Sequence, residues 1–198
     1  MAELKDFMMS RVRVSLIELF YSRPTEMFYV RQITREVTEE INAVRRELDR
    51  MLQNGLIRKE QRGNRLYYTL NTQYQYYNEL LCMVSKSAGL GREFIKKKAK
   101  LGKLQFVVFS GKFAKHLQRS HEDIDVLIVG EVIQAEVSLL IQQEEKRRER
   151  EINYTIFSPE EFEFRKQRRD PFLLDQLSGS RIMVIGDEEE LIARKPQL

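Results

Sequence analysis

Four residues near the middle of the chain could together bind a metal ion and a phosphate group. Gly111 and Lys112 follow one apolar run, and Asp123 and Asp125 open a second. Alternate residues of a strand point to the same face, so the two carboxylates would lie together, as oxygen ligands of Mg²⁺ do. The pattern predicts Mg²⁺ bound with a nucleoside triphosphate. The alternative is that the two acids cap or solvate a loop.

The segments around these four residues alternate between strand and helix character. Apolar runs rich in β-branched residues predict strands, and apolar residues at helical spacing predict helices. The predicted strands are Phe106–Phe109, Ile124–Val129, Ile152–Phe157 and Arg181–Ile185. The predicted helices are Val132–Arg150, a helix capped by Ser158, and Pro171–Leu177. This alternation is typical of an α/β domain.

Residues 92–198 resemble the minimal nucleotidyltransferase domain. That family carries a Gly-Ser turn, ten intervening residues and an Asp-x-Asp pair; here Gly111-Lys112 is followed by ten residues and then by Asp123-Ile124-Asp125. The resemblance implies an α/β fold with a mixed sheet. It also implies that Gly111 and Lys112 bind nucleotide, and that Asp123 and Asp125 hold Mg²⁺ and are the catalytic acids if the domain is active.

The sequence departs from this family at two positions. Lys112 replaces the serine of the turn, and Asn153 stands where a later strand should supply a third carboxylate. Glu151 lies two residues earlier and is a candidate substitute. We therefore expect a catalytically degenerate domain that acts as a sensor or assembly module. The alternative is an active Mg²⁺-dependent nucleotidyltransferase.

The first seventy residues predict three helices followed by a β-hairpin. The helices are Arg11–Tyr21, Tyr29–Val37 and Glu40–Asn54; the strands are Leu56–Glu60 and Arg65–Leu70, joined by a turn that contains Gly63. This order, and the passage Val44–Ile57 in particular, resembles the winged helix-turn-helix domain of ArsR-like and MarR-like bacterial regulators. The resemblance implies a prokaryotic transcriptional regulator that binds double-stranded DNA as a homodimer.

Within such a domain the third helix would enter the major groove and the hairpin would contact the DNA backbone or minor groove. Arginine pairs well with guanine, and asparagine with adenine. The candidate DNA-binding residues are Arg31, Asn42, Arg45, Arg46, Arg50, Arg62 and Arg65. Asp49 and Glu47 are expected near the same surface, where they would weaken its positive field. The alternatives are a solvated helix face or a protein-binding winged helix.

The charge is distributed unevenly along the chain. Residues 1–70 carry 13 basic and 10 acidic side chains (+3), residues 92–119 carry 9 and 1 (+8), and residues 120–198 carry 11 and 18 (−7). The basic first two thirds suit a polyanionic partner. His116 and His121 lack a partner at ligand spacing, and we interpret them as polar loop residues.

Together these patterns predict an α+β protein of two domains. The winged helix occupies residues 1–72, a connecting helix with a hinge at residues 87–91 occupies residues 73–91, and the nucleotidyltransferase-like domain occupies residues 92–198. The start of the chain lacks the apolar core of a secretory signal, and no apolar run is long enough to cross a membrane. We therefore expect a cytoplasmic protein with no membrane contact.

Overall fold

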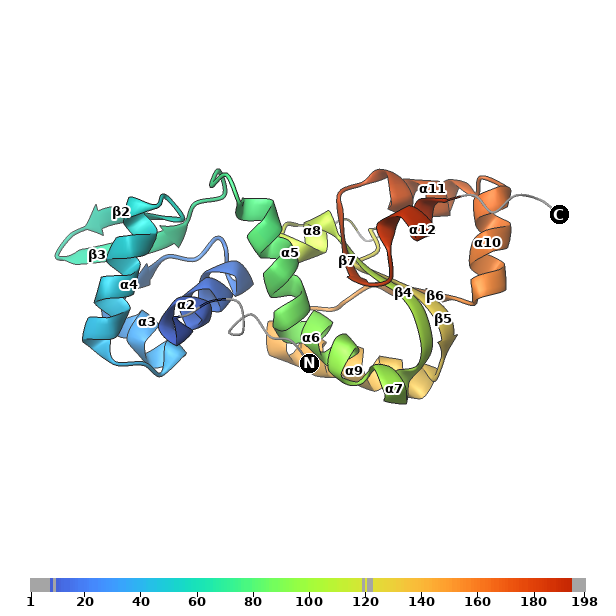
Figure 1. Ribbon diagram of the computed structural model, residues 1–198, viewed down its shortest axis with the longest axis horizontal. Coiled ribbons are helices and arrows are strands. Elements are labelled where there is room, and N and C mark those ends of the chain that lie inside the picture. Colours follow the sequence, from blue (N-terminus) through green and yellow to red (C-terminus); the bar gives the residue numbers. More distant parts are fainter. Residues whose placement is uncertain (1–7, 9, 119, 121–122, 194–198) are drawn as a thin grey trace. The chain divides into compact units, whose positions relative to one another are not determined.

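The computed structural model describes residue 8, residues 10–118, residue 120 and residues 123–193. The chain forms two compact units, residues 1–84 and residues 85–198, which are described separately (Figure 1). The first contains a three-stranded antiparallel sheet, and the second a four-stranded mixed sheet. The protein is thus of mixed α+β character, with one mixed sheet as predicted.

Helices and the short antiparallel sheet make up the first unit. Its elements are α2 (Arg11–Ser22), β1 (Phe28–Tyr29), α3 (Val30–Val37), α4 (Ile41–Gln53), β2 (Ile57–Arg62), β3 (Arg65–Leu70) and most of α5 (Tyr77–Ser87). The side chain of Ser10 caps α2, and that of Glu40 caps α4. Gly55 follows α4 at φ +75°, a left-handed conformation that suits glycine at a helix end.

The core of the first unit forms where the apolar stripes of the three helices meet β1. Seven residues with at most 1% of their surface exposed form it: Leu16, Ile17, Phe20, Phe28, Ile33, Val44 and Leu48. Burying each such side chain contributes about 1.5–3 kcal/mol relative to leaving it exposed. This core fixes which side of α4 faces inward, and therefore which residues of α4 face solvent.

The second unit is built on the mixed sheet in the order β6-β5-β4-β7. Its elements are α6 (Gly89–Lys96), α7 (Lys98–Leu101), β4 (Gly102–Ser110), α8 (Gly111–Ala114), β5 (Val126–Val132), α9 (Gln134–Arg148), β6 (Tyr154–Phe157), α10 (Pro159–Gln167), α11 (Pro171–Ser178), β7 (Arg181–Ile185) and α12 (Glu188–Ile192). Strands β5 and β6 are parallel because α9 crosses between them, and the other pairs are antiparallel.

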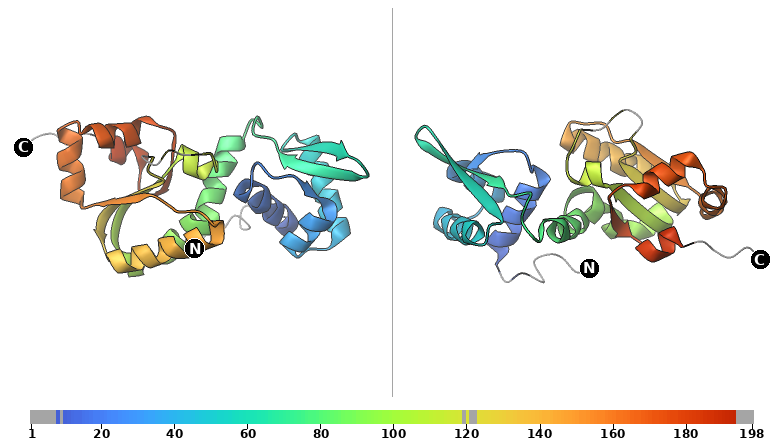
Figure 2. Two further views of the ribbon diagram at one scale, coloured as in Figure 1. Left: turned by 180° about the vertical axis from the view of Figure 1, so that it is seen from behind. Right: turned by 90° about the horizontal axis from the view of Figure 1, so that it is seen from above.

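Helices cover both faces of this sheet, as Figures 1 and 2 show. On one face, Phe106 and Val108 of β4 belong to a buried cluster with Phe162 of α10, Leu173 of α11 and Leu191 of α12. On the other face lie α6 and α9, which contact each other. With both faces covered, the stretches 106–109 of β4 and 126–129 of β5 are entirely apolar and buried, which explains their clear signal in the sequence.

Two boundaries refine the sequence predictions. Strand β5 begins at Val126, so Asp123 and Asp125 precede the strand rather than opening it. In place of the hinge predicted at residues 87–91, the helical structure is broken only between Ser87, where α5 ends, and Gly89, where α6 begins. There, a Cβ atom added to Gly91 would lie 1.9 Å from the carbonyl oxygen of Ser85, so this close approach requires glycine.

None of the helices in the described part of the chain combines the length and the apolar character that a membrane crossing requires.

Candidate functional site

The turn at the end of β4, an inner strand of the mixed sheet, carries Gly111 and Lys112. The hydroxyl of Ser110 accepts a hydrogen bond from the backbone N–H of Phe113 at 3.2 Å and so caps α8. Gly111 donates its backbone N–H to the carbonyl oxygen of Ser180 at 2.6 Å. A Cβ atom at residue 111 would lie 1.9 Å from the hydroxyl oxygen of Ser180. The close approach to Ser180 therefore accounts for the glycine without any phosphate.

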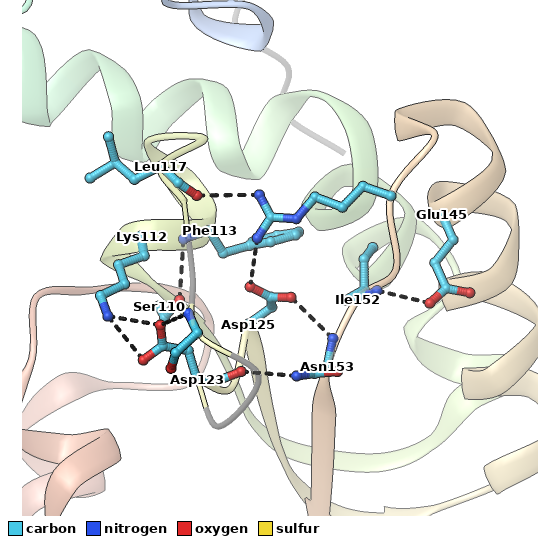
Figure 3. A network of polar contacts seen from close by, with 11 residues as sticks. Ser110, Lys112, Phe113, Leu117, Asp123, Asp125, Glu145, Ile152 and Asn153 are labelled. Carbon is cyan, nitrogen blue, oxygen red and sulfur yellow. Dashed lines mark hydrogen bonds and ion pairs between the residues drawn. The ribbon is translucent and has the colours of Figure 1, made fainter.

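Lys112 points toward Asp123 (Figure 3). Its ammonium nitrogen lies 2.9 Å from one carboxylate oxygen of Asp123 and 2.8 Å from the other. The backbone N–H of Ser120 donates to the second oxygen at 2.7 Å. The hydrogen bonds from Lys112 and then from Ser120 hold the pKa of the Asp123 carboxyl below its usual value. Both oxygens of the carboxylate are therefore held by groups of this chain.

Asp125 lies in a different environment, with only 1% of its surface exposed. Its carboxylate accepts a hydrogen bond from the backbone N–H of Asn153 at 3.0 Å, and a guanidinium nitrogen of Arg150 lies 3.5 Å from its other oxygen. Figure 3 shows this carboxylate directed toward Asn153. The structure thus brings Asp125 and Asn153 together and gives the carboxylate an arginine partner.

Asn153 joins the loop before β5 to the start of β6. Its side-chain amide donates a hydrogen bond to the backbone carbonyl oxygen of Asp123 at 3.2 Å. Its backbone carbonyl oxygen accepts hydrogen bonds from the backbone N–H groups of Asp125 and Val126 at 2.8 and 3.1 Å. Asn153 therefore fixes the backbone that carries both acids. Glu151, the candidate substitute for a third carboxylate, lies in the segment between α9 and β6 and is exposed.

A cavity of about 220 Å³ opens beside the turn. Its lining comes from the turn, the loop before β5 and the end of α11: Ser110, Gly111, Lys112, Asp123, Ile124, Asp175, Gln176, Ser178, Gly179 and Ser180. Asp125 does not belong to this lining. Asp123 therefore borders this cavity, whereas Asp125 is buried behind the loop.

This donor set does not fit a divalent cation as the residues are arranged. A shared Mg²⁺ site needs several oxygen ligands directed at one point. Asp123 is bound by Lys112, and Asp125 by Arg150 and Asn153. Among the described residues, no group of three or more His, Cys, Asp or Glu side chains is placed to hold a metal.

His116 lies beside this site in a left-handed conformation, at φ +55°. Burial, together with the nearby guanidinium groups of Arg148, Arg150 and Arg147, lowers the pKa of His116 to about 4. The imidazole is therefore neutral at physiological pH. His121, the second histidine considered in the sequence, lies outside the described residues.

The second candidate surface is the solvent side of α4. Asn42, Arg45 and Arg46 are exposed, and Val44, Leu48 and Met51 hold the opposite side in the core. The carboxylate of Glu40 accepts hydrogen bonds from the backbone N–H groups of Asn42 and Ala43, both at 2.8 Å. This cap, which the sequence reasoning missed, occupies the amides at the start of α4.

Glu47 corrects the expectation of a surface acid, because it is only 3% exposed. It accepts a hydrogen bond from Nε of Arg13 at 2.6 Å, a second from the hydroxyl of Ser10 at 3.3 Å, and a third from Arg50 at 3.2 Å. Glu47 thus removes negative charge from the exposed side of α4. It also draws Arg50, a predicted DNA-binding residue, into an ion pair, although the Arg50 side chain stays 59% exposed.

The remaining predicted DNA-binding residues are exposed on α3 and the hairpin. Arg31 lies on α3. Arg62 and Arg65 face each other across the hairpin turn, which Gly63 makes at φ +54°. Arg62 pairs with Glu60 at 2.9 Å, and the guanidinium of Arg65 lies 5.0 Å from the centre of the Tyr29 ring. Arg62 and Arg65 therefore each already have a partner within the unit.

Known proteins resemble this chain only weakly. No protein-family model matches the chain, and no curated protein matches it. Reduced HlyU from Vibrio cholerae N16961 has 14% identity and a TM-score of 0.32, over 39% of this chain and 77% of HlyU. Human N-acetylserotonin methyltransferase in complex with SAM has 13% identity and a TM-score of 0.30, over 51% of this chain and 33% of that enzyme. At these values neither likeness establishes a shared fold or function.

Proposed function

We propose that this protein is a DNA-binding transcriptional regulator whose first unit is a winged helix-turn-helix domain. The observation that carries the proposal is the solvent side of α4, where Asn42, Arg45 and Arg46 are exposed and Glu47 is withdrawn into the core. In this assignment α4 is the recognition helix and the β2–β3 hairpin is the wing. Two further features support it: the helix order before the hairpin, and the basic balance of residues 1–70.

The side chains on this surface have separate roles in the proposal. Arg45 and Arg46 pair with guanine edges, and Asn42 pairs with adenine, because their donors and acceptors match those bases in the major groove. Arg31 and Arg50 contact phosphate. Arg62 and Arg65 at the wing contact phosphate or the minor groove after releasing their present partners. The DNA-reading domain would span residues 1–72, and it would act as a cytoplasmic homodimer, since two-fold readers match palindromic sites.

A gel-shift experiment with DNA from the protein's own upstream region tests this proposal. Arg45→Ala with Arg46→Ala should weaken specific binding by at least about thirtyfold, because two lost base contacts of about 1–3 kcal/mol each sum to at least about 2 kcal/mol. The matched control is Arg168→Ala with Arg169→Ala, which removes the same charge from two adjacent exposed residues of the second unit. The control should bind as the unaltered protein does.

Two outcomes would reject the proposal. One is the absence of any salt-sensitive shift, because phosphate contacts make protein–DNA affinity fall as salt rises. The other is an equal loss of binding in the Arg45/Arg46 and Arg168/Arg169 variants, which would make the binding a property of net charge alone.

For the second unit, we propose a nucleotidyltransferase-like domain, residues 92–198, that no longer transfers nucleotides and serves as a sensor or assembly module. The support is the pairing of Lys112 with Asp123, the pairing of Arg150 with Asp125, and the amide of Asn153 at the expected place of a third acid. The connecting segment would span residues 73–91. The alternative is an active Mg²⁺-dependent enzyme with the winged helix choosing its target.

Incubation with labelled nucleoside triphosphates and Mg²⁺ separates these two alternatives. We expect no transfer of label. Label transfer that Asp123→Asn or Asp125→Asn abolishes would establish the enzyme instead. Calorimetry with ATP and Mg²⁺ would show whether the 220 Å³ cavity, which Gly111 and Lys112 help to line, still takes a nucleotide.

A further inference from the structure

In the second unit, basic side chains of the protein itself neutralise Asp123 and Asp125. Each oxygen of the Asp123 carboxylate lies within 2.9 Å of the Lys112 ammonium nitrogen. Oxygen Oδ2 also accepts the backbone N–H of Ser120. A divalent cation that bound both oxygens of this carboxylate would have to displace the ammonium group. Lys112 therefore occupies the position from which a cation would approach.

The second acid is neutralised separately. Asp125 is almost fully buried, and burying a carboxylate without a cationic partner is costly. Arg150 supplies that partner at 3.5 Å, and the backbone N–H of Asn153 adds a hydrogen bond at 3.0 Å. Two acids therefore face two basic side chains. One lysine and one arginine supply the same total charge as one divalent cation.

Burial does not oblige the Lys112 side chain to point toward Asp123. The side chain is 54% exposed, so solvent could hydrate its ammonium group. It nevertheless makes a two-oxygen contact with Asp123, a residue eleven positions away on the far side of a loop. This contact links α8 to the segment that enters β5.

We infer that Lys112, assisted by Arg150, is a tethered counter-ion that takes the place of a divalent cation at the Asp123–Asp125 pair. A serine side chain at residue 112 would be too short to make this two-oxygen contact, whereas the lysine places a positive charge against both oxygens of Asp123. The inference rests on the proposed nucleotidyltransferase-like character of the second unit and on nothing in the DNA-binding proposal. The inference predicts that replacing Lys112 with a shorter, uncharged residue allows a divalent cation to bind at Asp123.

The test measures binding of Mn²⁺ to the full chain, using the loss of the free-ion electron paramagnetic resonance signal. The unaltered protein should show no saturable binding. Lys112→Ser should gain saturable Mn²⁺ binding, at least about tenfold tighter than any residual binding by the unaltered protein, because it removes the ammonium group from both oxygens of Asp123 and with it a repelling charge. The double variant Lys112→Ser with Asp123→Asn should lose that binding. Circular dichroism and thermal unfolding would show that each variant is folded.

Lys103→Ser is the matched control. Lys103 is an exposed lysine of the same unit that also pairs with a carboxylate, Glu131, at 3.1 Å. Its replacement removes the same charge and breaks an ion pair of the same kind, but it leaves the ion pair between Lys112 and Asp123 intact. The control should therefore gain no Mn²⁺ site.

Three results would overturn the inference. The first is Asp123-dependent binding of Mn²⁺ by the unaltered protein as tight as that by Lys112→Ser. The second is a folded Lys112→Ser variant that gains no binding. The third is a gain that survives Asp123→Asn or that Lys103→Ser reproduces. A failed gel-shift experiment would leave all three measurements unaffected, so failures of the two proposals are distinguishable.

Discussion

Replacing Glu47 with glutamine would test whether the buried charge network holds α4 in place. The substitution keeps the shape of the side chain but removes its charge. Glu47 accepts hydrogen bonds from Arg13, Ser10 and Arg50, and its side chain is only 4% exposed. The Arg13 contact is the shortest of the three and joins α2 to α4. We therefore expect the variant to lose much of the attachment between these helices.

The size of the effect follows from the exposure of the partners. Breaking a fully buried ion pair costs about 3–5 kcal/mol, and a hydrogen bond to a charged group contributes about 1.5–3 kcal/mol. The side chains of Arg13 and Arg50 are 38% and 59% exposed, so water can hydrate them after the change. We accordingly expect the free energy of unfolding to fall by about 2 kcal/mol, which is below the range for a fully buried ion pair and within the range for one hydrogen bond to a charged group.

Urea denaturation followed by tyrosine fluorescence is a suitable assay, because the signal comes mainly from the first unit. The chain has no tryptophan, and seven of its eight tyrosines lie in residues 21–77. With a denaturant slope of about 1–3 kcal/mol per molar, a loss of 2 kcal/mol lowers the urea midpoint by about 1 M. The matched control is Glu39→Gln, whose partner Arg11 lies 3.8 Å away and is 89% exposed.

The control should change the free energy of unfolding by less than about 0.5 kcal/mol, as is usual for exposed pairs. If the midpoint of Glu47→Gln moves no further than that of Glu39→Gln, the network does not hold α4. The orientation of its arginines would then need another explanation.

Two other substitutions probe the second unit. Gly111→Ala should lower the free energy of unfolding by about 1–3 kcal/mol, because its Cβ would lie 1.9 Å from a side-chain oxygen of Ser180. Gly179→Ala, where nothing lies within 4 Å, should be nearly neutral in the same thermal unfolding series; equal losses would refute the packing explanation. His116 has its pKa lowered to about 4 in the folded protein, against about 6.5 when unfolded, so its contribution to stability is complete above pH 6.5 and is lost as the pH falls toward 4. His116→Gln should therefore flatten the decline in melting temperature between pH 7 and pH 5, and parallel curves would contradict the assignment.

The sequence predicted the longer helices and strands because their signals are local. The stripe of Val44, Leu48 and Met51 identified α4 and its buried side, and Gly63 identified the hairpin turn. The two-residue strand β1 was not predicted, because it is a strand only through its pairing with β3, which lies about 40 residues later in the chain. A two-residue segment carries no periodicity from which a strand could be inferred.

The side-chain partners could not be predicted in the same way. Glu47 is three residues after Val44, on the inward stripe, which was a usable signal for a buried acid. Its partner Arg13 is 34 positions away and becomes apparent only when α2 and α4 pack together. The proximity of Lys112 and Asp123 likewise depends on the path of an intervening loop. Spacing identified the residues of the site, but it did not reveal which charges neutralise which.

The contact between Gly91 and Ser85 has a practical consequence for preparing the second unit alone. A fragment that starts at residue 92, at the domain boundary predicted from the sequence, would discard both members of this contact and the buried side chain of Leu90. A fragment that starts at residue 85 would keep all three. We expect the longer fragment to be the better choice for crystallisation and for measurements on the isolated domain.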